Sequence, residues 1–498
     1  MRTKRPFPFA PFAPDQPKSI GSGSGEAKGV IWKDGAYRPF NDFASYGSSA
    51  TFPGRVVGAR GISDAGGAVH FFAGTGSNLY KMKSRAPALV SKSGGYGLAN
   101  VPAWTFEPYG NRVVAVGAGV KPQVWEFGQS TEFRDLAGDP PMSETAFVVR
   151  EWLFLASDRT LTWSAFNNID SDVSWTPSFE LQSGFGDLQA SGGRIMCGLS
   201  GEVGVCFQER AINRIAYVGN PTTWQIDQVE DGRGAIGPHA ACRYGASFFF
   251  VAEDGFFMFD GARAVSIGDG AVDRYFASRV NYSRRDQVCI AADTERKALI
   301  VTFPAGSSST ANEVLIYSLS GQRWTRDEMG MEFIFDAPIE GIVPDDTEAV
   351  EAAFGTEIVD EFPADLSFDG PEWSESRRQW MAINTNHTLG TFAGLPRTAT
   401  VDTAQVEVIP ARQAFVSEVW PLTDAPEASV RSAIAAGRSR LATAIDTESI
   451  AYGTMNSVGF CPVRASGRYV AARVEIASGA TWTELAGVHF DARDAGAR

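Results

Sequence analysis

A chain of 498 residues is too long for one compact core, since hydrophobic cores stop growing at about 250–300 residues, so two or more domains are expected. The formal net charge of −14 disfavours a protein that grips nucleic acid, because gripping requires Lys and Arg to displace counterions from the phosphates. It does not exclude a protein that DNA slides past. The 52 glycines, 34 phenylalanines and 12 tryptophans favour many short strands joined by turns, which predicts an all-β fold.

The first 28 residues predict an extended arm. Prolines at positions 6, 8, 11, 14 and 17 alternate with Phe7, Phe9 and Phe12, and proline disfavours both helices and central strands. Large aromatic side chains would gain no burial in a free tail. We therefore expect these three residues to contact a neighbouring subunit or another partner, with simple disorder as the alternative.

Residues 29–330 repeat one pattern, in which a short apolar strand, a Gly or Asp turn and a second apolar strand follow one another. Clear copies start near residues 70, 112, 152, 194 and 247, which are about 40 to 53 residues apart. This spacing, with several short strands in each unit, is typical of β-propeller blades. We predict a divergent propeller of about six blades without the WD40 signature, and a pair of stacked β-sandwiches as the alternative.

Residues 331–396 form an acidic insertion or linker with little repeat character. No Lys or Arg occurs from Met331 to Ser376, while carboxylates crowd together. Such a run is either a solvated loop or a lumen or gate element that repels a polyanion. The candidate lumen or gate residues are Asp345, Asp346, Glu348, Glu351, Glu357, Asp360 and Glu361.

Residues 397–498 alternate apolar and polar side chains and predict a small antiparallel β-domain with one solvated face. All ten of its basic residues are Arg, which tolerates desolvation better than Lys and is enriched at interfaces. Arg464 and Arg468 are therefore candidate subunit-interface residues, although an ordinary exposed face would also explain them.

Signals of catalysis or cofactor binding are weak. The four histidines are isolated, the five cysteines lack a CxxC pair, and no GxSxG, P-loop or helix-opening GxGxxG occurs. We expect buried free thiols in a reducing compartment, no metal or other cofactor, no membrane span and no enzymatic activity. The stretch 170–176 resembles in part the structural Asp-box of sialidase propellers, without its central glycine. The loop 230–238 is interpreted as shaping the propeller rim.

Three stretches, taken in order, resemble the tail nozzle proteins of short-tailed bacteriophages, also called tail tubular protein B or tail hub proteins. They are Trp163–Asn168 continuing to Val173–Trp175, Glu209–Gly219 followed by Trp224 and the loop 230–238, and Asp254–Gly261 with Ile267–Gly268 and Val272–Phe276. A C-terminal run, Gly459–Tyr469 ending in Gly479–Trp482, is also similar. The resemblance covers roughly residues 30–330 and 397–498 but not the acidic stretch.

The resemblance implies a structural virion protein that forms a homohexameric ring below the portal and the adaptor (head-tail connector). The ring would provide and close a channel through which DNA is ejected without sequence-specific binding, and a tail fibre or tailspike is a further implied partner. The implied location is the virion tail, with assembly in the host cytoplasm. A carbohydrate-binding or glycan-hydrolysing β-propeller is the alternative, and a cellular propeller scaffold is a third interpretation.

Overall fold

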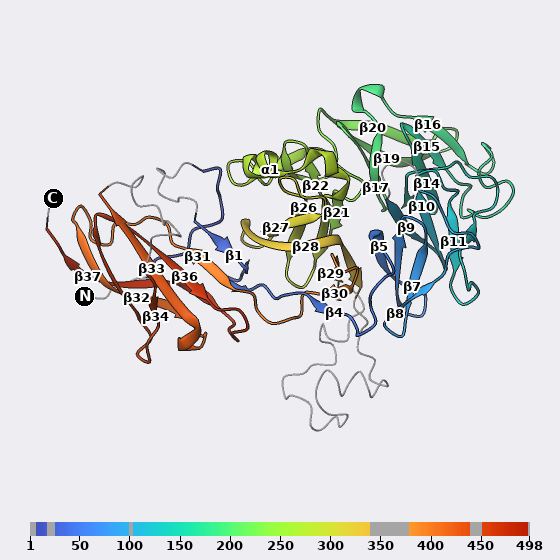
Figure 1. The fold of residues 1–498 in the computed structure, drawn as a ribbon. Coiled ribbons are helices and arrows are strands. Elements are labelled where there is room, and N and C mark those ends of the chain that lie inside the picture. Colours follow the sequence, from blue (N-terminus) through green and yellow to red (C-terminus); the bar gives the residue numbers. More distant parts are fainter. Residues whose placement is uncertain (1–5, 17–24, 99–102, 339–377, 439–450, 497–498) are drawn as a thin grey trace, which may run out of the picture.

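The computed structural model describes residues 6–16, 25–98, 103–338, 378–438 and 451–496. These residues form two lobes, a β-propeller and a smaller β-sandwich (Figure 1), so the predicted all-β class with an additional β-domain is confirmed. Helices are few and short in this part of the chain: α1 (Asp273–Arg279) and the 3₁₀ turns Ala190–Gly192, Tyr282–Gln287 and Glu427–Ser429.

The propeller begins with consecutive four-stranded antiparallel blades in which the first strand of each lies innermost. Blade 1 contains β5 (Val56–Ser63), β6 (Val69–Thr75), β7 (Leu79–Lys83) and β8 (Ala86–Leu89). Blade 2 contains β9 (Trp104–Tyr109), β10 (Arg112–Gly117), β11 (Gln123–Glu126) and β12 (Arg134–Asp135). Blade 3 contains β13 (Thr145–Val149), β14 (Trp152–Ser157), β15 (Thr160–Trp163) and β16 (Gly184–Asp187).

Three further blades continue this order around the axis. Blade 4 contains β17 (Ile195–Leu199), β18 (Gly204–Gln208), β19 (Ala211–Gly219) and β20 (Thr223–Asp231). Blade 5 contains β21 (Ala241–Tyr244), β22 (Ser247–Ala252), β23 (Gly255–Phe259) and β24 (Ala264–Ser266). Blade 6 contains β25 (Cys289–Asp293), β26 (Ala298–Phe303), β27 (Ala311–Ser318) and the first half of β28 (Arg323–Pro338).

A seventh blade closes the ring, so the predicted count of about six becomes seven. The second half of β28 pairs with β29 (Arg378–Asn384), which pairs with β30 (Leu389–Thr391) and then with β4 (Ala44–Ser45). Innermost strands contact one another all the way round, and β28 lies between β25 and β5. This blade is assembled from three separate segments of the chain and therefore leaves no repeat in the sequence.

The blades are held by apolar side chains on both faces of their middle strands. Strands such as β14 and β26 are buried almost throughout, because each blade is covered by a neighbour on either side. One cluster joins blades 1 and 2 around Phe72 and Trp125, and another joins blades 3 and 4 around Phe154 and Trp224. At Gly198 a Cβ would lie 2.0 Å from the Phe147 ring, so this inter-blade contact requires glycine.

The second lobe is a sandwich of two sheets. One sheet has the order β2 (Val30–Lys33), β3 (Ala36–Pro39), β37 (Leu485–Asp494), β32 (Ala414–Thr423) and β35 (Cys461–Gly467). The other has β1 (Ala27–Lys28), β31 (Ala399–Asp402), β36 (Tyr469–Ile476), β33 (Val430–Gly437) and β34 (Gly453–Thr454). Strand β1 also pairs in parallel with β28, so one sheet runs from blade 6 into the sandwich.

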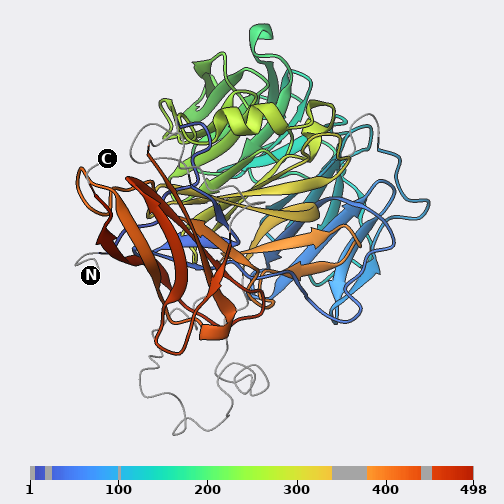
Figure 2. The same ribbon diagram turned by 60° about the vertical axis from the view of Figure 1, so that its left-hand side comes forward.

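The structure moves two predicted domain boundaries. The hairpin β2–β3, placed in the propeller by the boundary at residue 29, belongs to the sandwich. Residues 331–338 and 378–391, assigned to the acidic insertion, are strands of the seventh blade. In Figure 2 the sandwich comes forward, and the N-terminal strands, drawn in blue, lie at its junction with the propeller.

Candidate functional site

A pocket of about 380 Å³ opens on the propeller axis. Residues from the innermost strands, or from the loops that follow them, line it in all seven blades, among them Arg60, Glu107, Thr145, Ser200, Arg243, Thr294 and Asp336. The inner strands run in the same direction, and most of these polar residues lie in the second half of a strand or just beyond it. One end of the pocket is therefore charged.

The charged end contains two ion pairs. Arg60 contacts Glu107, and its Nη1 also donates to the carbonyl oxygen of Phe106 at 2.8 Å. The Glu107 side chain is 6% exposed, and its Oε2 accepts a hydrogen bond from Ser200 Oγ at 3.0 Å. Burial raises the pKa of Glu107, and Arg60 opposes this shift. Arg378 pairs with Asp336 across blade 7.

Arg243 lies exposed at the edge of this charged end. Its Nη1 donates to the Ser200 carbonyl oxygen at 3.0 Å, and its Nε donates to the Gly245 carbonyl oxygen at 2.9 Å. Three arginines thus face two carboxylates at the pocket, Glu107 and Asp336. The pocket has a formal charge of +1 in a chain whose total is −14.

Other residues that line the pocket are apolar and uncharged. They include Cys197, Cys242, Ile290, Ala292 and Phe333. His239 packs edge-on against the Phe333 ring, with centroids 4.7 Å apart, and burial lowers its pKa to about 4, so its imidazole is neutral at pH 7. Burial raises the pKa of the Cys197 thiol to about 12, which excludes a thiolate nucleophile there.

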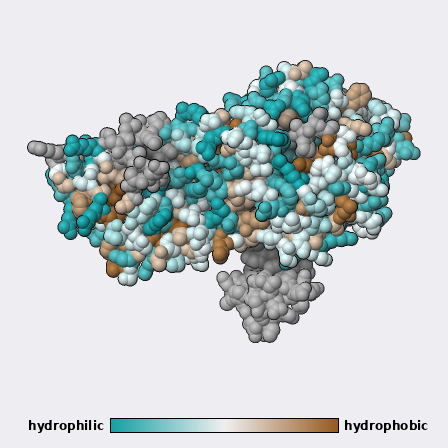
Figure 3. Space-filling model, viewed as in Figure 1, coloured by the Kyte–Doolittle hydropathy of each residue, from teal (hydrophilic) through white to brown (hydrophobic). Residues whose placement is uncertain are grey.

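A second feature is a set of exposed apolar side chains, here called the rim patch, on the outer edge of blade 3 and the tip of blade 4. It consists of Phe166, Phe179, Leu181, Phe185 and Val218, whose exposed fractions are 52%, 63%, 37%, 64% and 50%. The Phe166 amide donates to the Leu181 carbonyl oxygen at 2.9 Å, and Gln182 reaches Tyr217 in blade 4 at 3.4 Å. The face drawn in Figure 3 is mostly hydrophilic, with small scattered apolar groups.

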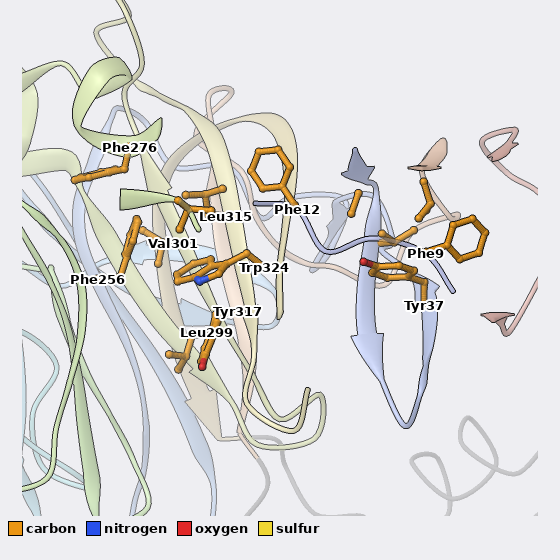
Figure 4. Packing of buried hydrophobic residues seen from close by; sticks show 14 of the residues in the cluster. Phe9, Phe12, Tyr37, Phe256, Phe276, Leu299, Val301, Leu315, Tyr317 and Trp324 are labelled. Atoms are coloured by element: carbon orange, nitrogen blue, oxygen red, sulfur yellow. The ribbon is translucent and has the colours of Figure 1, made fainter. Parts of the chain in front are cut away.

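The N-terminal arm packs against its own chain, which corrects the expectation that its aromatic residues contact another molecule. Phe9 is 2% exposed and packs edge-on against Tyr37 (Figure 4). Phe12 is 5% exposed and packs against Tyr275, with ring centroids 5.3 Å apart. Phe7 exchanges backbone hydrogen bonds with Val488. The physical reason is that both lobes offer apolar surface on the path of the arm.

The remaining predicted residues are not brought together. Arg464 and Arg468 are exposed in and just after β35, and Arg468 Nε pairs with Glu407 Oε1 at 3.0 Å. The candidate gate residues, from Asp345 to Glu361, lie outside the described residues. All five cysteines are buried and unpaired, as predicted.

The two loops that the sequence singled out connect blades. Asp170 is buried, and its carboxylate pairs with Arg134 and accepts the Ala137 amide at 3.0 Å, which joins blade 3 to blade 2. Trp175 Nε1 donates to the Ile169 carbonyl oxygen at 3.0 Å within the same turn. The loop 230–238 leads from blade 4 to blade 5, and Pro238 reaches the axial pocket.

Sequence reasoning missed both features. The pocket charges come from four blades, 1, 2, 5 and 7, and nothing in a single repeat marks them. The rim patch had a visible signal, because the long turn between β15 and β16 carries two phenylalanines, with a third just after it in β16, where polar residues are usual. Among the described residues, no group of three or more His, Cys, Asp or Glu side chains is placed to hold a metal ion, and no helix is long and apolar enough to cross a membrane.

Comparisons with known proteins give weak likenesses. No family model and no curated protein matches the sequence. Two solved structures, both of the extracellular domain of a B. thetaiotaomicron protein described as a one-component or hybrid two-component system, match with TM-scores of 0.41 and 0.39 at 8% identity. They cover 70% and 76% of this chain, which spans about two fifths of their length (39% and 41%). Similarities this weak support no conclusion about function.

Proposed function

We propose that this chain is a structural protein of a bacteriophage tail, a nozzle or hub subunit that assembles into a ring, most simply a homohexamer, below the portal and adaptor. The ring would provide and close the channel for DNA ejection. The proposal assigns the chain no catalysis. The virion tail, the adaptor and a tail fibre or tailspike belong to the same proposal as location and partners.

The rim patch is the observation that carries this proposal. Soluble monomers rarely gather several large apolar side chains on one exposed surface, and such surfaces are typical of protein interfaces. Three of its five residues are phenylalanines, and aromatic residues are enriched at interfaces. Phe166 belongs to the first stretch that resembles nozzle proteins. A patch at the propeller rim suits a heterologous contact with the next subunit, and such contacts close into rings.

The two-lobed build supports a load-bearing role. One β-sheet and the arm both join the propeller to the sandwich, so the lobes are connected by more than a single linker. A subunit in a ring through which DNA passes must resist force without unfolding. The assignment of the acidic run to a lumen or gate remains a prediction from charge.

The test compares the particle mass of the full chain with that of patch variants by mass photometry. We expect the wild type to form a closed oligomer and Phe179→Ser/Phe185→Ser to shift toward the 53.5 kDa monomer. Both side chains are more than 60% exposed, so folding should persist. Leu89→Ser is the matched control, since Leu89 is 62% exposed on blade 1. An oligomer unaffected by the patch variant, or a monomeric wild type, contradicts the proposal.

A further inference from the structure

We propose that the axial pocket binds a small organic monoanion with an apolar body, of the class of aromatic carboxylates. This site is separate from the rim patch. The inference goes beyond the tail role and holds whether or not the chain forms a ring.

The pocket has the size and composition of a small-molecule site. Ligand pockets usually enclose about 300–1,000 Å³ and combine apolar walls with a few placed polar groups. This one has about 380 Å³, and its lining combines apolar residues from blades 4 to 7 with ionic groups from blades 1, 2, 5 and 7. The nearly buried Glu107 carboxylate is fixed by Arg60 and Ser200, so the polar end is a built arrangement.

The charge at the pocket selects an anion. Arg60, Arg243 and Arg378 outnumber Glu107 and Asp336 by one positive charge, and His239 contributes none. Both carboxylates already face an arginine, so a cation would meet no free negative group among the described residues. A carboxylate ligand instead supplies the missing negative charge, and arginine binds carboxylates with paired N–H donors.

The arginines retain donors for such a ligand. Among the described residues, Arg60 makes its side-chain hydrogen bonds through Nη1 alone, which leaves Nε and Nη2. Arg243 uses Nη1 and Nε, and these contacts hold its guanidinium at the pocket edge.

The apolar residues of the pocket determine the chemistry of the rest of the ligand. Ile290, Ala292, Phe333 and the neutral Cys197 and Cys242 thiols offer no charge and few hydrogen bonds. A highly hydrated anion such as phosphate would lose its hydrating water there without gaining hydrogen bonds in exchange. An aromatic or branched aliphatic body gains from burial on the same surface.

Isothermal titration calorimetry of the full-length chain tests this with three probes: benzoate, its neutral analogue benzyl alcohol, and inorganic phosphate. We expect benzoate to bind and the other two to bind at least about tenfold more weakly, since each lacks one half of the recognised chemistry. Arg378→Gln and Arg243→Gln should each weaken benzoate binding by about tenfold.

Arg263→Gln is the control, because the Arg263 side chain is 78% exposed on blade 5 and its Nε lies 4.0 Å from the Asp260 carboxylate. Thermal unfolding verifies that each variant is folded, and Arg243 is exposed enough for its replacement to be tolerated. The inference is overturned if millimolar benzoate gives no binding, if phosphate or benzyl alcohol binds as tightly as benzoate, or if both pocket variants bind benzoate like the control.

Discussion

At the scale of single residues, the buried pair of Arg473 and Asp402 shows how the sandwich tolerates charge. Arg473 Nε donates to Asp402 Oδ1 at 2.7 Å and Nη2 donates to Oδ2 at 2.8 Å, while the Glu26 amide donates to Oδ2 at 3.1 Å. Both side chains are at most 10% exposed. Burial raises the pKa of Asp402, and Arg473 counteracts this shift.

Replacing one partner should therefore lower the free energy of unfolding more than replacing both. We expect Arg473→Met to lower the free energy of unfolding by about 3–5 kcal/mol, since it leaves an uncompensated buried carboxylate. Arg473→Met/Asp402→Leu should recover most of this loss. Urea denaturation at pH 7 measures both. A double variant as unstable as the single one would show that the pair itself supplies the stability.

The environment of Asp273 predicts that the free energy of unfolding depends on pH. Its carboxylate accepts hydrogen bonds from the Phe256 amide at 3.1 Å and Ser266 Oγ at 3.2 Å, yet burial raises its pKa to about 6. Because the folded-state pKa exceeds the ordinary value of 3.8, the folded state holds the proton more tightly. The contribution of Asp273 to the free energy of unfolding is therefore complete below pH 3.8 and is lost as the pH rises through about 6.

Comparing wild type with Asp273→Asn isolates this effect. From pH 4 to pH 7 the wild type should lose about 1–2 kcal/mol relative to the variant, after allowance for solvent screening of a half-buried group. The measurement is the difference in unfolding free energy at the two pH values. Parallel pH profiles for the two proteins would show that Asp273 does not titrate in this range.

At the scale of elements, the arm fastens the lobes together. Its Phe7 pairs with β37 of the sandwich, and its Phe12 packs against Tyr275 of α1 and donates its amide to the Trp324 carbonyl oxygen of blade 6. Both arm aromatics therefore serve the monomer. The pattern of prolines and phenylalanines predicted an extended arm docked on another molecule, with disorder as the alternative, because a pattern cannot say onto which molecule a segment docks.

Truncating the arm aromatics should reveal this role. Phe12→Ala is expected to cost about 3–4 kcal/mol, because a buried ring is lost next to Tyr275 and Arg326. Phe7→Ala should cost clearly less, since Phe7 is only partly buried. Chemical denaturation compares the two. Equal, small losses would mean that the arm is not part of the stable core.

The blades illustrate what periodicity could and could not predict. Where a blade is continuous in sequence, as in blades 1 to 5, its glycine turns and apolar strands recur visibly. The seventh blade has its inner strand in β28, its outer strand in β4 near the N-terminus, and residues 339–377 between β28 and β29. Such a unit becomes recognisable only when distant segments pair, so the sequence repeats alone account for about six blades.

At the scale of the whole molecule, the pairing of β4 with β30 closes the ring. A Cβ on Gly390 would lie 2.1 Å from the Ala44 carbonyl oxygen, so Gly390→Ala should push the two strands apart and destabilise the chain by about 1–3 kcal/mol. Gly76→Ala is the control, with nothing within 4 Å of its Cβ, and should change stability by less than about 0.5 kcal/mol. Thermal unfolding compares the two variants. Equal unfolding midpoints would refute the claim that the contact between β4 and β30 requires glycine at position 390.

The propeller and an additional antiparallel β-domain were predictable from strand spacing and alternation, whereas the two-sheet build of that domain and the axial pocket were not. Its charged residues are remote in sequence and meet only because the inner strands of successive blades run side by side around the axis. Most of the rim patch lies in or next to one long turn, and its phenylalanines were visible but had no assigned face until the turn was placed at the outer edge of blade 3.

The central claim is that many copies of this chain assemble into a tail ring. Negative-stain electron microscopy of the purified full-length chain, with native mass spectrometry on the same sample, tests it most directly. The account predicts rings with a central hole and a mass of about six times 53.5 kDa. A stable monomer at micromolar concentration, with no ring in any image, would contradict it.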